Sequence, residues 1–131
     1  MTGGPGQHTS RGAILILEDE YLIATLIAEH VTASGYRVVG PAAAADRAQE
    51  LVNEMGIDAA LLDVRLTGGR RSFDLAVRLQ AMRVPFAFVT AFSQAMFPAA
   101  LRDVPVLIKP PTRADVARLL HELLPASSGS R

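Results

Sequence analysis

The chain has 131 residues, of which half are hydrophobic and none is cysteine, and its 13 basic and 13 acidic side chains cancel. A chain of this length and apolar content can bury the core of one domain without disulfides or a structural metal. The charge balance gives no indication of nucleic-acid binding, and the absence of cysteine excludes thiol catalysis. Because that absence also fits a reducing compartment, we expect a cytoplasmic protein.

The two ends of the sequence lack the pattern of a folded core. Residues 1–12 are rich in Gly, Ser and Thr, and residues 126–131 are small and mostly polar. We expect both to be flexible tails around one domain of residues 13–125. The first apolar run, residues 13–17, is too short for a signal peptide or a membrane span, so we expect no membrane association.

Short apolar runs alternate with longer stretches of helical periodicity, which is typical of parallel strands joined by helices. The predicted strands are residues 13–17, 36–39, 59–62, 85–89 and 104–108. The predicted helices are residues 21–33, 43–55, a helix capped by Ser72, residues 93–101, and a helix capped by Thr112. Right-handed crossovers then favour an α/β fold: a doubly wound, five-stranded parallel sheet with the flavodoxin-like strand order 2-1-3-4-5 in a three-layer sandwich.

Each predicted helix has an apolar face that we expect to pack against the sheet. In chain order these faces consist of Leu22, Ile23, Leu26, Ile27 and Val31; Ala48, Leu51, Val52 and Met55; Leu75, Ala76, Leu79 and Met82; and Val116, Leu119, Leu120 and Leu123. The helix of residues 93–101 is the exception, because Pro98 removes an amide donor and clashes with the preceding turn. We expect it to be short, bent or mobile.

Polar side chains follow four of the predicted strands. Glu18 and Asp19 follow the first, Asp63 the third, Thr90 the fourth and Lys109 the fifth. In open α/β sheets the carboxyl ends of the strands form the ligand site, so we expect these residues to lie together. Crowded carboxylates repel one another and need a cation, and Mg²⁺ prefers such oxygen ligands. Asp19 and Asp63 are the best direct ligands.

This combination predicts a phosphoryl-transfer site with a carboxylate nucleophile. Mg²⁺ would neutralise an incoming phosphoryl group, while Lys109 offers a positive charge and Thr90 a hydroxyl donor to its oxygens. Any one of these residues alone is more often a helix cap, a strand end or a surface lysine. The prediction depends on all of them following strands of the same predicted sheet.

Four segments resemble the motifs of the response-regulator receiver family, and the resemblance extends over residues 13–124. The segments are residues 14–20 (ILILEDE), 60–64 (ALLDV), 88–91 (FVTA) and 108–110 (IKP). The resemblance implies that Asp63 is the phosphoacceptor. It also implies a cis peptide bond between Lys109 and the proline that follows it.

The same resemblance implies roles for the other residues of the site. Glu18 and Asp19 form the acidic pair that holds Mg²⁺ with Asp63, and the backbone carbonyl of Arg65 completes the metal shell. Thr90 is the switch hydroxyl and Lys109 contacts the phosphoryl group.

Two segments depart from the usual receiver pattern. Val106 stands three residues before the lysine, where receivers usually carry Tyr or Phe, so the switch hydroxyl lacks its usual aromatic partner. Residues 85–92 partly resemble the Pro-Phe-x-Phe-Ala-Thr-Gly-Tyr signature of an atypical group of receivers, often single-domain and linked to HWE-type sensor kinases in alphaproteobacteria. Val89, Ala91 and Phe92 replace its Ala, Gly and Tyr. In this group Phe92 and the short helix after it would carry the signal.

The resemblance implies a signalling protein rather than an enzyme: a single-domain response regulator of a two-component phosphorelay. A sensor histidine kinase, of the HWE type, or a histidine phosphotransfer protein would donate the phosphoryl group to Asp63, and the regulator would signal by protein contact. The expected contact surface, which is also a candidate homodimer interface, is the face formed by the helix of residues 93–101, the strand of residues 104–108 and the last helix.

Two alternatives stay open. A haloacid-dehalogenase-like, Mg²⁺-dependent phosphatase also uses a carboxylate nucleophile after a strand, but it needs an acid two residues later, where this chain has Arg65. A degenerate receiver would act only as a binding module, and the complete set of acids, hydroxyl and lysine argues against it.

Overall fold

The fold is built on a five-stranded parallel sheet with the order β2-β1-β3-β4-β5. The computed structural model describes residues 11–66, 72–91 and 97–125. Its strands are β1 (Ala13–Leu17), β2 (Arg37–Ala42), β3 (Ala59–Leu62), β4 (Phe86–Thr90) and β5 (Val106–Ile108). The predicted flavodoxin-like strand order is therefore confirmed, and β1 and β3 have the predicted bounds.

β2 and β5 differ from their predicted bounds, and the main difference in each lies at a proline. β2 is an edge strand, where a proline is tolerated because its missing N–H faces no partner, and it continues past Gly40 and Pro41 with an irregular register. β5 begins only at Val106. Pro105 cannot donate to the ladder, although its carbonyl accepts a hydrogen bond from the Phe88 amide at 3.0 Å.

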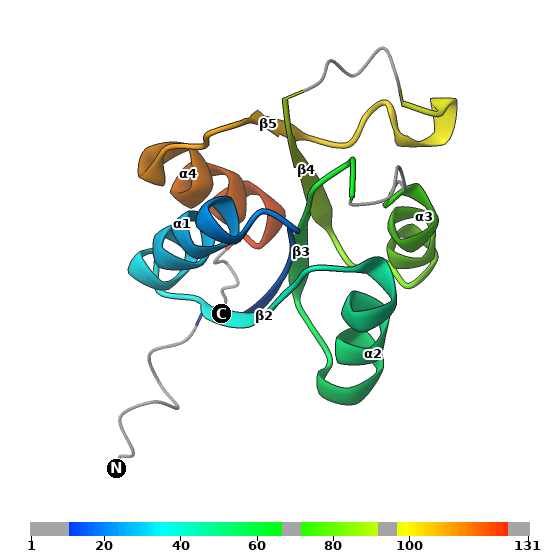
Figure 1. Cartoon of the computed structure of the whole chain (residues 1–131), viewed down its shortest axis with the longest axis horizontal. Helices are drawn as coiled ribbons and strands as arrows, with labels where there is room; N and C mark the ends of the chain where they lie inside the picture. Colours follow the sequence, from blue (N-terminus) through cyan, green and yellow to red (C-terminus); the bar gives the residue numbers. More distant parts are fainter. Residues whose placement is uncertain (1–10, 67–71, 92–96, 126–131) are drawn as a thin grey trace.

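Within the described residues, four α-helices cover the two faces of the sheet. Figure 1 shows α1 (Tyr21–Ala33) and α4 (Arg113–Leu123) on one face, and α2 (Ala45–Met55) and α3 (Phe73–Ala81) on the other. Within the range predicted as a helix of residues 93–101, the structure describes only a 3₁₀ turn, η4 (Ala99–Leu101), and residues 92–96 lie outside its description. Pro98 precedes the turn with an extended ψ of 150°.

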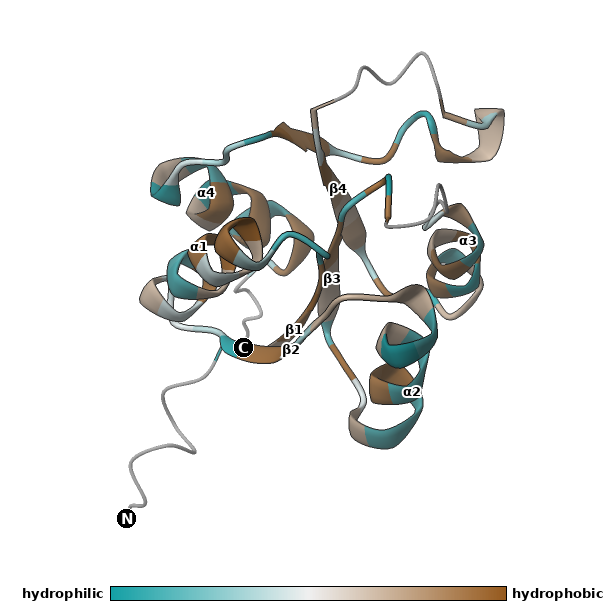
Figure 2. Ribbon diagram, viewed as in Figure 1, coloured by the Kyte–Doolittle hydropathy of each residue, from teal (hydrophilic) through white to brown (hydrophobic). Residues whose placement is uncertain are grey.

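The alternation of side chains along the strands divides the core into two parts. In β1, Ile14 and Ile16 pack with residues of α1 and α4, while Leu15 and Leu17 pack with residues of α2 and α3. All five residues of β1 are at most 2% exposed. Figure 2 shows the hydrophobic residues of the helices and strands gathered between the layers. A sheet covered on both faces places its ligand site at the strand ends.

Three predictions of inward-facing helix residues are wrong. Leu22 is 79% exposed, Met55 54% and Met82 52%. Each lies in or next to a terminal turn of its helix, where neighbouring elements cover less of the helix surface than they do at the central turns. Periodicity predicts which face of a helix turns inward, but not how far along the helix that face is covered.

Of the two predicted helix caps, one is confirmed and the other is wrong. The Thr112 side chain accepts a hydrogen bond from the Asp115 amide at 3.0 Å, so this predicted cap is confirmed. Ser72 stands before α3 but makes no side-chain cap.

The expected tails, residues 1–12 and 126–131, lie outside the described residues apart from Arg11 and Gly12. Over the three described ranges, no helix combines the length and the apolar content needed to cross a bilayer.

Candidate functional site

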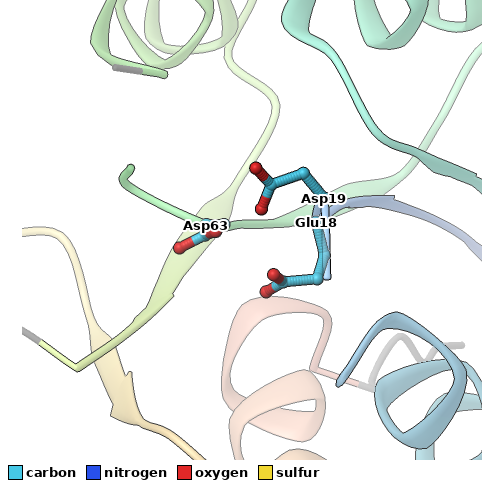
Figure 3. Close-up of side chains that lie close together, drawn as sticks. All are labelled: Glu18, Asp19 and Asp63. Atoms are coloured by element: carbon cyan, nitrogen blue, oxygen red, sulfur yellow. The ribbon is translucent and has the colours of Figure 1, made fainter. Parts of the chain in front are cut away.

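The ends of β1 and β3 bring three acidic side chains together. Glu18 and Asp19 directly follow β1, and Asp63 directly follows β3. The Asp63 amide donates to the Leu17 carbonyl at 2.8 Å, so the ladder between the two strands extends to the site. Figure 3 shows the carboxyl groups of Glu18, Asp19 and Asp63 close together at these strand ends.

We define the acidic cluster as Glu18, Asp19 and Asp63. One carboxylate oxygen from each residue lies within 4.8 Å of the other two, a spacing that could hold a metal ion. Glu18 is 2% exposed and Asp63 5%, whereas Asp19 is half-buried. Buried carboxylates at this spacing repel one another, so the cluster depends on nearby positive charge.

Lys109 supplies positive charge from the end of β5. Its Nζ lies 2.8 Å from Glu18 Oε1, 3.2 Å from Asp63 Oδ1 and 3.4 Å from Glu20 Oε1. Its backbone amide donates to the Thr90 carbonyl at 3.0 Å, which fixes the end of β5 beside β4. The predicted cis peptide bond between Lys109 and Pro110 is present, and a second one joins Gly40 to Pro41.

The surroundings of Asp63 change its acidity. Burial and the neighbouring charge of Glu18 raise the pKa of Asp63 from 3.8 to about 7, against the opposing effect of Lys109. Burial by itself lowers the pKa of Lys109, but the hydrogen bond to Glu18 and the charges of Asp63 and Glu18 outweigh it and raise that pKa above its ordinary value. The lysine is therefore a permanent cation, while the ionisation of Asp63 is finely balanced.

A pocket of about 330 Å³ opens in front of these residues. Its walls are formed by Asp19, Glu20, Asp63, Arg65, Leu66, Ala91 and Lys109. The pocket gives access to the Asp63 carboxylate even though that side chain is buried. Its size and charged rim suit a small anion accompanied by a cation.

Thr90 and Val106 lie on the two strands beside this pocket. Thr90 is fully buried at the end of β4 and pairs in register with Ile108. Val106 is partly buried in β5, pairs with Phe88, and occupies the position where an aromatic residue is usual in receivers. Phe92 lies outside the described residues.

Two residues of the site were not predicted. Glu20 contacts Lys109, and the run of three acids after β1 was the only signal for it in the sequence. Ser72 was predicted as a helix cap, but its fully buried hydroxyl instead donates to the backbone carbonyl of Asp63 at 2.6 Å. That carbonyl lies past the end of β3, so it needs a donor from outside the ladder.

The chain is similar to receiver proteins in sequence and in structure. The family model described as the response regulator receiver domain matches residues 14–117. The transcriptional regulatory protein PdtaR of Mycobacterium tuberculosis is 34% identical over 107 residues, which cover 79% of this chain and 52% of PdtaR. The chain thus matches about half the length of that relative.

Solved structures give the same result. SdrG from Sphingomonas melonis Fr1 is 41% identical with a TM-score of 0.76, over 86% of this chain and 95% of SdrG. The receiver domain of PhyR from Erythrobacter litoralis is 25% identical with a TM-score of 0.79, over 93% of this chain and 95% of that domain. With the flavodoxin-like sheet and the family match over residues 14–117, these likenesses show that the chain belongs to the response regulator receiver domain family.

Proposed function

We propose that the chain accepts a phosphoryl group on the carboxylate of Asp63. The observation that carries this proposal is the position of Asp63, buried at the end of β3 yet facing a pocket, with Lys109 Nζ 3.2 Å from its Oδ1. A carboxylate oxygen would form the new P–O bond as the P–N bond of a phosphohistidine donor breaks, and the leaving imidazole would take up a proton. Lys109 would pair with the phosphoryl oxygens.

Mg²⁺ is the cation that the acidic cluster would hold. Glu18, Asp19 and Asp63 offer oxygen ligands at a suitable spacing, and the backbone carbonyl of Arg65 would add a fourth. The donor set fits because the single charge of Lys109, which contacts Glu18 and Asp63 and also Glu20, cannot balance these carboxylates together with that of Asp19. When bound, Mg²⁺ would supply the positive charge that favours ionised Asp63 and offsets the charge of the incoming phosphoryl group.

The proposed switch begins at Thr90. Its hydroxyl would donate to the phosphoryl oxygens, and because Val106 offers no aromatic partner, the change would pass to the segment that follows β4. A likeness supports activation by phosphoryl binding: a structure of SdrG from Pseudomonas melonis Fr1, 41% identical with a TM-score of 0.74, shows that protein in its BeF3-activated conformation.

The proposed partners are proteins. The donor would be a sensor histidine kinase of the HWE type or a histidine phosphotransfer protein, in the cytoplasm. The output surface, and the surface for a second copy of the chain, would be the face of η4, β5 and α4. Ile108 of β5 is 60% exposed, which is unusual for a large apolar side chain and supports a contact there.

The chain belongs to the response regulator receiver domain family, and the similar PhyR from Erythrobacter litoralis is named a response regulator, so we propose a signalling role rather than turnover of a substrate. A phosphatase of the haloacid-dehalogenase kind would need an acid two residues after its nucleophile, and Arg65 stands there.

Intact mass spectrometry tests the proposal. Wild-type protein incubated with acetyl phosphate and Mg²⁺ is expected to gain the mass of one phosphoryl group, and Asp63→Asn is expected to gain none. Asp103→Asn is the matched control, since this exposed aspartate lines a separate pocket near the first residue of β4 and should be modified like wild type. An adduct that survives Asp63→Asn, or no adduct on wild type, would refute the assignment.

A further inference from the structure

Glu20 occupies an unusual position for a helix-capping residue. It is the N-cap of α1, and its carbonyl accepts the first helical hydrogen bond, from the Ala24 amide at 2.8 Å. Its side chain makes no cap, although a carboxylate would be well placed to accept from the free amides of the first turn. Instead its Oε1 lies 3.4 Å from Lys109 Nζ, a contact between residues 89 positions apart in the sequence.

The Lys109 ammonium contacts as many carboxylates as it has protons. It carries three N–H donors, and Glu18, Asp63 and Glu20 each place an oxygen within 3.4 Å of Nζ. A phosphoryl oxygen on Asp63 would compete with these carboxylates for the Lys109 ammonium. The Glu18 and Asp63 side chains are 1% and 5% exposed, so their carboxylates are buried at the strand ends.

Glu20 is the partner that can leave. Its side chain is 67% exposed, so it loses little on returning to water. It also lines the pocket through which a donor reaches Asp63. Its negative charge therefore has two effects. It forms an ion pair with Lys109, and it repels an anion at the entrance of the pocket.

We propose that Glu20 is a positioning residue that holds the Lys109 ammonium in the unphosphorylated protein and slows phosphoryl transfer from small anionic donors to Asp63. The proposal rests on the proposed function of Asp63. It follows that the site discriminates between donors: a free anion meets the charge of Glu20, whereas a donor protein can offer a cationic side chain that pairs with Glu20 and frees Lys109.

The test is the rate of phosphorylation by acetyl phosphate at saturating Mg²⁺, measured as the growth of the phosphorylated mass. Glu20→Gln keeps the shape of the side chain and removes its charge. We expect it to speed the reaction by roughly two- to five-fold at low ionic strength, which is the effect of losing one exposed ion pair. Because added salt screens the charge of Glu20, the ratio of the variant rate to the wild-type rate is expected to fall toward one as the salt concentration rises.

Glu29→Gln is the matched control. It removes the same charge from an exposed position further along α1, and it is expected to react at the wild-type rate. A Glu20→Gln rate equal to or below that of Glu29→Gln, or an acceleration that salt leaves unchanged, overturns the role of Glu20 and leaves phosphorylation of Asp63 intact. A wild-type protein that takes up no phosphoryl group overturns both proposals.

Discussion

The hydroxyl of Ser72 donates a hydrogen bond of 2.6 Å to the backbone carbonyl of Asp63, and both residues are buried. The Ser72 amide also donates to the Val64 carbonyl at 3.0 Å. Two contacts therefore join the start of α3 to the chain just past β3. This arrangement holds the backbone of the proposed phosphoacceptor in addition to the ladder with β1.

Ser72→Ala tests this contact. Removing the hydroxyl leaves the buried Asp63 carbonyl without that donor, which is expected to lower the free energy of unfolding by about 1–3 kcal/mol in urea denaturation. Ser34→Ala is the control: its hydroxyl also donates to a backbone carbonyl, that of His30 at 2.8 Å, but at a half-buried helix end. Equal losses in the two variants would contradict a special role for burial at Ser72.

The raised pKa of Asp63 predicts how the stability of the metal-free protein depends on pH. Because this pKa rises to about 7 through burial and the charge of Glu18, the folded protein binds the proton more tightly than the unfolded chain does. Its contribution to stability is complete below about pH 4 and is lost as the pH rises through about 7.

Asp63→Asn removes this titration. As the pH rises, wild type loses this contribution and the variant does not. The free energy of unfolding of the variant minus that of wild type is therefore expected to increase by about 2 kcal/mol between about pH 5 and pH 8, measured in urea with a chelator present. Asp103→Asn, an exposed aspartate, should give a profile parallel to that of wild type. A parallel profile for Asp63→Asn as well would show that Asp63 is ionised throughout.

Mg²⁺ is expected to stabilise the folded protein, because only the folded chain assembles the acidic cluster. At about one hundred times its dissociation constant, the ion should add about 2.7 kcal/mol, which thermal unfolding at constant ionic strength would detect. Asp19→Asn removes one proposed ligand from a half-buried position and should abolish most of this gain. Glu29→Gln should keep the gain, and a gain retained by Asp19→Asn would place the ion elsewhere.

Phe97 anchors the segment before η4 in the core. It is 2% exposed, and its ring centroid lies 4.9 Å from that of Phe88 and 5.7 Å from that of Phe73. Phe97→Ala is expected to cost about 3–5 kcal/mol of stability. Met82→Ala is the contrast, since Met82 is 52% exposed and should cost less than about 0.5 kcal/mol. Comparable losses in denaturant melts would contradict the burial of Phe97.

The sequence by itself determined the order of the strands, the bounds of β1, β3 and α1, and the residues that gather at the strand ends. These features depend on local rules: apolar runs favour buried strands, helical periodicity favours amphipathic helices, and parallel connection brings all carboxyl ends to one edge. Thus Asp63 and Lys109 could be placed together although they belong to different strands.

Only the tertiary structure decided which side chains touch and how deeply each is covered. Leu22 follows the helical pattern yet is exposed, and Phe97, which belongs to none of the predicted apolar faces, lies in the core. The hydroxyl of Ser72 bonds to Asp63 instead of capping α3, and Glu20 reaches a lysine 89 positions away. These outcomes depend on the exact separation of elements distant in the sequence, because burial and hydrogen bonding change over a few ångströms, and no local pattern encodes that distance.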